Sequence, residues 1–131
     1  MTFNPYQVVL DAFTQGDFVF TMFISGSVTT ADVGKAVSLD TTADGTVKLA
    51  ADDDAIYGRI YQVEDRSQEG VTTVSVETRF RKRVPIASGE TVNRGDTVIG
   101  AGAGEVKAAV TANPAANIVL AVDGDYAIVE K

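Results

Sequence analysis

The chain of 131 residues contains no cysteine and no histidine. Without cysteine it can form no disulfide framework, and it has no thiolate nucleophile or thiol metal ligand. Without histidine it lacks the commonest general base and the commonest metal ligand. Catalysis by a serine–histidine or cysteine–histidine pair is therefore excluded, and we expect no enzymatic activity, no cofactor and no metal.

Basic residues are fewer than acidic ones, 11 against 18, which gives a net charge of −7. This balance argues against a broadly basic surface, so we expect no nucleic-acid partner. The longest apolar-rich run, Phe18–Ile24, is far too short to span a bilayer, so we expect no membrane partner. The first residues also lack the basic and apolar regions of a signal peptide. These features predict a soluble protein made in a cytoplasm.

One pattern occurs twice, as GKAVSLDTTADGTVKLA from Gly34 and as GDTVIGAGAGEVKAA from Gly95. Each copy begins with glycine, places valine three residues later, crosses a turn and ends in Gly-x-Val-Lys-x-Ala. The matched positions are Gly34/Gly95, Val37/Val98, Gly45/Gly104, Val47/Val106, Lys48/Lys107 and Ala50/Ala109. Each copy predicts a β-hairpin. Because an isolated hairpin is marginal in water, both hairpins need a core shared with other strands.

Further short strands are predicted on both sides of these hairpins. Asp17–Ser25 is the strongest, and both of its faces are apolar, so we expect it to be central or covered, with most of the aromatic burial here. Ala55–Val63 and Val71–Phe80 are expected to pair, with Gly58 at a bulge or close backbone contact. Asn117–Val122 and Asp125–Glu130 form a final hairpin. About nine or ten short strands indicate an all-β sandwich or barrel, as a single β domain over 17–131.

Residues 1–16 are expected to form an N-terminal arm that carries a single charge. Tyr6–Phe13 is compatible with a short helix and also with an extended conformation. An apolar terminal segment of this kind either docks on its own domain or contacts a partner. The candidate contact residues in this arm are Phe3, Tyr6, Val9, Leu10 and Phe13.

Four of the eleven basic residues lie close together: Arg79, Arg81, Lys82 and Arg83. The three arginines would line one face of a strand, where like charges repel unless acidic groups answer them. Glu77 and the loop Asp52–Asp54 could supply these groups within the chain, and an acidic partner protein could supply them from outside. A nucleic acid is less favoured because the cluster has no interleaved aromatic residues.

Three other motifs are better explained by local structure than by chemistry. Asp52–Asp54 lacks calcium-loop spacing and predicts a solvated loop. The glycines of Gly100–Gly104 lack the Lys-Ser/Thr of a phosphate loop and predict a hairpin tip. Arg94-Gly95-Asp96 matches the integrin tripeptide, but turn chemistry is favoured because the repeat already accounts for Gly95. A carboxylate-pair sugar cleft has little room in a barrel of this size.

The stretch VTTADVGKAVSLDTTADGTVKLAADDDAIYGRIYQVE, followed by VPIASGETVNRGDTVIGAGAGEVKAA, resembles small capsid decoration (cement) proteins of tailed bacteriophages. The resemblance covers roughly residues 28–110, and its later part is carried by Gly89, Glu90, Val92, Gly95, Asp96 and Val98. It implies a small β-barrel or β-tulip fold without enzymatic activity. It also implies binding to the major capsid protein on the outer surface of the expanded head, often as trimers, with the N-terminal arm reaching onto neighbouring subunits.

Two other functions remain open at this point. One is a different phage structural role, such as a tail-tube, head-completion or fibre-base protein, which would have the same composition. The other is a ligand-binding or hydrolytic β-barrel, which would need a pocket with convergent polar groups.

Overall fold

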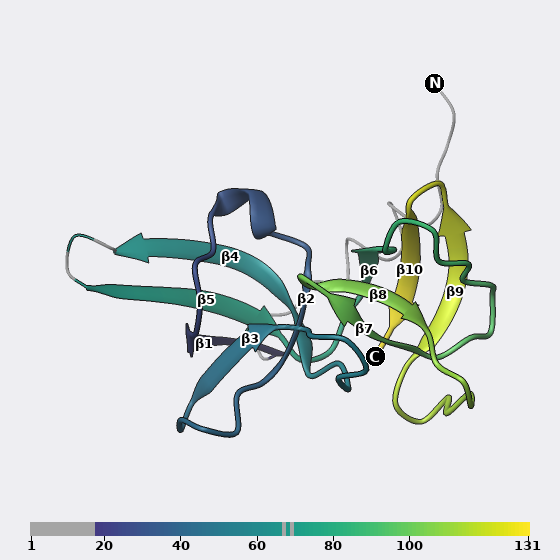
Figure 1. Ribbon diagram of the computed structural model, residues 1–131, viewed down its shortest axis with the longest axis horizontal. Coiled ribbons are helices and arrows are strands. Elements are labelled where there is room, and N and C mark those ends of the chain that lie inside the picture. Colours follow the sequence, from purple (N-terminus) through teal and green to yellow (C-terminus); the bar gives the residue numbers. More distant parts are fainter. Residues whose placement is uncertain (1–17, 67, 69) are drawn as a thin grey trace.

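The computed structural model describes residues 18–66, 68 and 70–131, and these form an all-β fold (Figure 1). The elements are β1 (Val19–Ile24), the 3-10 helix η3 (Thr30–Asp32), β2 (Ala36–Leu39), β3 (Thr46–Leu49), β4 (Gly58–Arg66), β5 (Val71–Glu77), β6 (Arg81–Pro85), β7 (Val98–Gly102), β8 (Glu105–Ala108), β9 (Ile118–Asp123) and β10 (Tyr126–Glu130). The predicted barrel is confirmed, because β1-β3-β2-β4-β5 close on themselves. Within the described part, no helix is long and apolar enough to cross a membrane.

The first half of the described chain, residues 18–78, forms this closed barrel. β1 runs parallel to β3 and antiparallel to β5, so hydrogen bonds on both sides of β1 complete the circle. Closure leaves no free strand edge. The barrel is filled by one cluster of buried aliphatic side chains: Val28, Val37, Val47, Ile60, Val63, Val74 and Val76.

The second half, residues 80–131, contains the three-stranded sheet β6-β10-β9 and the hairpin β7–β8. Figure 1 shows these five strands beside the barrel. Their core also includes three side chains from the first half, so it extends across the junction between the halves. The buried members of this core are Ala36, Ala50, Ile56, Phe80, Val84, Val92, Val98, Val106, Val119, Ala127 and Val129.

The two repeated sequences form the hairpins β2–β3 and β7–β8, and both hairpins pair in the same register. Val37 faces Leu49 in the first hairpin, as Val98 faces Ala108 in the second. The matched glycines have φ angles of 96°, 62°, 87° and 78° at Gly34, Gly45, Gly95 and Gly104. Side chains with a Cβ rarely adopt this left-handed region. The glycines therefore repeat because the backbone conformation repeats.

The correspondence continues into the strand that follows each hairpin. In the first half the amide of Gly34 donates to the carbonyl of Ile60 at 2.9 Å. In the second half the amide of Gly95 donates to the carbonyl of Val119 at 2.8 Å. β4 and β9 thus occupy matching places, and each then pairs antiparallel with the next strand, β5 or β10.

The first and last strands of each half also correspond. β1 pairs antiparallel with β5, as β6 does with β10. The amide of Thr78 donates to the carbonyl of Phe18, and the amide of Lys131 donates to that of Phe80, both at 2.9 Å. The repeat is therefore wider than the sequence predicted, since β1–β5 correspond in order to β6–β10.

Pro85 marks the point where the second half departs from the first. In the closed barrel, the amide of Phe23 donates to the carbonyl of Gly45 at 3.1 Å and so helps to join β1 to β3. Pro85 takes the matching place in β6 and has no amide hydrogen to donate. Among the described residues, a single bridge between Ile86 and Val106 pairs β6 with β8. The amide of Ala87 still donates to the carbonyl of Val106 at 3.0 Å, as that of Ser25 donates to Val47 in the first half, so this seam is only partly open.

The carbonyl of Gly104, to which Pro85 cannot donate a hydrogen bond, joins the two halves. The carbonyl of Gly104, which matches Gly45, accepts a hydrogen bond from the amide of Ala36 at 2.8 Å. The amide of Gly104 donates to the carbonyl of Ala50 at 3.1 Å. Nearby, a Cβ on Gly100 would overlap the carbonyl oxygen of Ala51. The β7–β8 hairpin therefore packs backbone against backbone on the first barrel.

Two local predictions had different outcomes. Gly58 was expected at a bulge or close contact, and a Cβ there would lie 2.6 Å from the carbonyl oxygen of Glu77, so the close contact is confirmed. β1 was expected to be central with buried aromatics, and its central position is also confirmed. The burial is wrong for Phe20 and Phe23, which are 50% and 55% exposed.

Candidate interaction surface

The basic cluster lies at the turn from the first half to the second and continues along β6. Arg79 was expected to share a strand with Arg81 and Arg83, which is wrong because β5 ends at Glu77 and the chain bends before β6 begins. Arg81 and Arg83 alternate with Lys82 along β6, so these two arginines lie on one face and Lys82 on the other. The four cations therefore have different surroundings.

Lys82 points inward and pairs with Glu77, which confirms one of the predicted internal partners. Its Nζ lies 3.3 Å from Oε2 of Glu77, whose side chain is only 2% exposed. Nη1 of Arg59 lies 2.9 Å from the other oxygen, Oε1. The Nε of Arg59 donates to the carbonyl of Arg83 at 2.8 Å. A buried carboxylate with two cations thus ties β4 and β5 to β6, which makes these contacts structural.

The three arginines lie beside aromatic or acidic side chains at the surface. Arg79 lies over the ring of Phe18, with its Cζ 5.6 Å from the ring centre. Arg81 donates to Glu130 at 2.7 Å, and Arg83 lies 5.0 Å from the ring centre of Tyr126. Stacking of this kind holds a guanidinium in place while its edge stays available to a partner.

Phe18, Arg79, Arg81, Arg83 and Tyr126 form a continuous strip that we call the arginine strip. A cavity of about 290 Å³ connects its first members and is lined by Phe18, Arg79, Phe80, Arg81, Glu130 and Lys131. Burial lowers the pKa of Lys131, and the nearby charge of Arg79 lowers it further. The charged residues that line this cavity are three basic ones, Arg79, Arg81 and Lys131, and one acidic one, Glu130.

Two phenylalanines of β1 are also exposed, and they lie on opposite faces of the strand because side chains alternate along it. Phe20 is 50% exposed and Phe23 is 55% exposed. Exposed rings of this size are costly to leave in water, and aromatic side chains are enriched at contact surfaces. Sequence reasoning missed their exposure because a strand with two apolar faces is normally covered on both.

The predicted contact residues of the arm, Phe3, Tyr6, Val9, Leu10 and Phe13, lie outside the described residues. The arm would join the chain at Phe18, the first member of the arginine strip. Its proposed contacts therefore stay a prediction.

The acidic loop Asp52–Asp54 does not form ion pairs with the basic cluster, so that predicted pairing is wrong. Asp52 and Asp53 instead lie 2.6 Å and 2.8 Å from Nζ of Lys107, on the hairpin of the second half. The hydrogen bond with Asp52, followed by that with Asp53, raises the pKa of Lys107. Lys48, which matches Lys107 in the repeat, lies 3.5 Å from the third carboxylate, Asp54.

Asp54 is held by hydrogen bonds from a side chain and from the backbone. It accepts from the hydroxyl of Ser38 at 2.8 Å and from the amide of Ala51 at 3.1 Å. These bonds, with that of Ser38 the larger influence, lower the pKa of Asp54. The backbone of the loop also links the two halves, since the amide of Asp53 donates to the carbonyl of Gly100 at 2.9 Å and the amide of Gly100 donates to that of Asp54 at 2.8 Å, so the loop is more than a solvated turn.

The remaining motifs have structural positions. Gly100–Gly104 belongs to β7 and the hairpin tip, as predicted, and contacts the first barrel. In the Arg94-Gly95-Asp96 turn, the carboxylate of Asp96 accepts from the amide of Asn93 at 2.8 Å, which confirms the predicted turn chemistry. Over the range that the structure describes, no group of three or more acidic side chains converges on a possible metal position.

Comparisons with known proteins do not add a family to this description. No protein-family model and no curated protein sequence matches the chain.

Proposed function

We propose that the protein is a bacteriophage capsid decoration (cement) protein that binds the outer surface of the expanded head and stabilises it without enzymatic activity. The observation that carries the proposal is the exposure of Phe20 and Phe23 on β1, the strand that follows the predicted arm. The resemblance to phage cement proteins supplies the partner, which is the major capsid protein. The protein would be made in the host bacterial cytoplasm and would remain on the virion.

The fold is suited to this role because its two halves are fastened at several points. The Gly104 backbone contacts, the Lys107 pairs and the Glu77 ion cluster all cross the junction. A rigid body of this kind loses little conformational entropy when it binds. Many copies on a symmetric shell then add their individually weak contacts by avidity. We further propose that the protein assembles with itself, with a trimer favoured by the resemblance.

The arginine strip adds electrostatic selectivity to the apolar contact. Arg79 and Arg83 lie on stacked aromatic rings, in a chain whose net charge is −7. A local basic strip on an acidic molecule orients it toward an acidic patch while the rest of its surface is repelled. The strip therefore contributes mainly to association rate and orientation, and the phenylalanines with the arm contribute mainly to affinity.

The proposal is tested by binding to expanded heads from which decoration protein is absent. A chain without residues 1–15 should stay folded but lose binding in a sedimentation assay. The double variant Phe20→Ser, Phe23→Ser keeps the arm and should weaken binding by at least about tenfold, since each ring is an aromatic anchor. Val110→Ser, at a fully exposed apolar residue away from β1 and β6, is the matched control. Undiminished binding by the truncated chain and by the double variant would contradict the proposal.

A further inference from the structure

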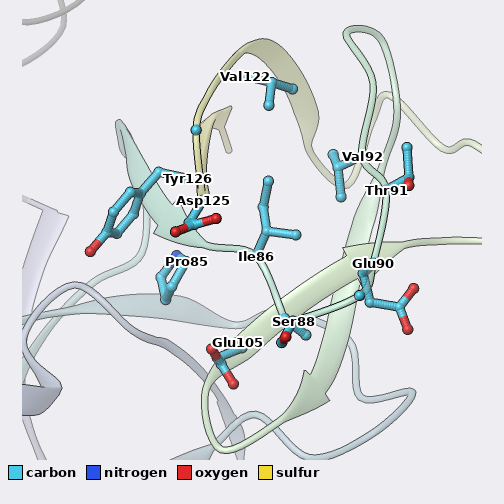
Figure 2. A pocket seen from close by; sticks show the side chains of 13 residues that line it. Pro85, Ile86, Ser88, Glu90, Thr91, Val92, Glu105, Val122, Asp125 and Tyr126 are labelled. Atoms are coloured by element: carbon cyan, nitrogen blue, oxygen red, sulfur yellow. The ribbon is translucent and has the colours of Figure 1, made fainter.

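A cavity of about 510 Å³ lies beside the partly open seam of the second half (Figure 2). In the first half the matching seam is closed by the pairing of β1 with β3. Pro85 of β6 lacks the amide hydrogen that Phe23 donates at this place in β1. The cavity is lined by Pro85, Ile86, Ala87, Ser88, Gly89, Glu90, Thr91, Val92, Glu105, Val122, Gly124, Asp125 and Tyr126. It therefore lies mainly between the segment 85–92 and the end of the β9–β10 hairpin, with Glu105 as its lining residue from β8.

The internal repeat shows that this hollow leaves part of an apolar core uncovered. Val122 faces Ala127 across β9–β10, as Val63 faces Val74 across β4–β5. Val63 is 7% exposed, whereas Val122 is 43% exposed. Figure 2 shows Val122 and Ile86 at the hollow, so both offer contact area to an apolar occupant.

The charged groups that line the hollow are all carboxylates. Three carboxylates line it, those of Glu90, Glu105 and Asp125, and no lysine or arginine is among the lining residues. In Figure 2 the carboxylates stand at separate points around the apolar side chains, which agrees with the absence of a convergent metal position among the described residues. Such a rim favours an extended occupant with cationic groups on both sides of an apolar one.

We propose that this cavity binds a peptide segment of a partner protein, with an aliphatic side chain between flanking lysines or arginines. The aliphatic side chain packs on Ile86, Val92 and Val122, and the cations lie against the carboxylates. The volume of the cavity, about 510 Å³, provides space for a short extended segment. This site contains no residue of β1 and shares only Tyr126 with the arginine strip, so it would remain a peptide site even if the capsid role were wrong.

The test uses the full chain and three capped peptides in a ¹⁵N–¹H NMR titration. The probe is acetyl-Lys-Leu-Lys-amide, and the matched controls are acetyl-Glu-Leu-Glu-amide, which reverses the charges, and acetyl-Lys-Gly-Lys-amide, which removes the apolar group. For a ligand this small we expect a dissociation constant on the order of 1 mM. Saturable shifts should centre on the amides of Ile86, Val92, Val122 and Gly124, with at least about threefold weaker binding of either control.

Two variants separate a site from general attraction to an acidic protein. The double variant Glu105→Gln, Asp125→Asn should weaken the probe at least about threefold, whereas Asp44→Asn, at an exposed carboxylate on the β2–β3 turn, should leave it unchanged. All of these carboxylates lie at the surface or only partly buried, so the fold should persist, and the spectrum itself verifies this. Equal shifts with the charge-reversed peptide, shifts spread over the whole surface, or unchanged binding by the double variant would each overturn the proposal.

Discussion

Replacing Glu77 by glutamine tests how firmly the two halves are joined. The side chain of Glu77 is 2% exposed and carries the negative charge between Arg59, 15% exposed, and Lys82, 13% exposed. Glutamine keeps nearly the same shape and one acceptor oxygen, so the Arg59 hydrogen bond can survive. The charge is lost, however, and Lys82 then lies almost buried beside an amide.

The expected cost follows from this burial. Breaking a buried ion pair by removing one partner costs about 3–5 kcal/mol, because the other charge stays desolvated. Both cations here retain some contact with water, so we expect about 3 kcal/mol, at the lower end of that range. In urea unfolding this corresponds to a fall in midpoint of at least about 1 M at an unchanged slope.

The repeat provides a matched control at Glu130, which occupies in β10 the place of Glu77 in β5. Glu130 pairs with Arg81 at 2.7 Å, but their side chains are 38% and 39% exposed. An exposed pair contributes only about 0–1 kcal/mol, so Glu130→Gln should change the midpoint little. If the two variants lose equal stability, or if Glu77→Gln loses less than about 1 kcal/mol, the Glu77 cluster does not fasten the junction as described.

Two further predictions concern the same junction. Gly100→Ala should destabilise the protein by about 2 kcal/mol, because the added Cβ overlaps a carbonyl of the first barrel. Ala103→Gly in the same hairpin should instead stabilise the protein by up to about 1 kcal/mol, since Ala103 has a φ of 53°. Thermal unfolding measures both changes, and a stabilised Gly100→Ala variant would disprove the close packing. Hydrogen bonds from Ser38 and Ala51 lower the pKa of Asp54 below its ordinary 3.8. The contribution of this carboxylate to the free energy of unfolding is therefore complete above about pH 4 and is lost as the pH falls through the folded-state pKa. Asp54→Asn should remove this part of the acid dependence of unfolding, and an unchanged pH profile would contradict the assignment.

The sequence allowed the fold class and the two repeated hairpins to be predicted because their signals are local. A glycine that must adopt a positive φ cannot be replaced without strain, so Gly34, Gly45, Gly95 and Gly104 preserve the repeat in the sequence. Alternating β-branched residues likewise indicate strands wherever one face is buried.

The wider repeat could not be predicted because its strands share a pattern of backbone hydrogen bonds but few side chains. Phe18 and Phe80 occupy matching places, yet the strands that follow them are FVFTMFI and FRKRVPI. Any alternating sequence satisfies backbone hydrogen bonds, so such strands diverge without losing the fold. The opened seam depends on one residue, Pro85, whose missing donor matters only once its place opposite β8 is known.

The surface was predicted only in part for a similar reason. A cluster such as Arg79–Arg83 is visible in the sequence, but its division between inward Lys82 and the stacked arginines depends on where β5 ends. Partners distant in sequence, such as Glu77 with Arg59 or Asp52 with Lys107, follow from topology and not from composition. The exposure of Phe20 and Phe23 is likewise decided by what the rest of the barrel leaves uncovered.

Electron microscopy of expanded phage heads mixed with the protein tests the proposed function most directly. The capsid role predicts density with the shape of a closed barrel and an adjoining second half over the whole outer surface of the head, at local three-fold positions, with β1 and the arginine strip toward the shell. The same density confined to one vertex or to the tail would favour a different phage structural role. The absence of any bound density on intact expanded heads would contradict the capsid role.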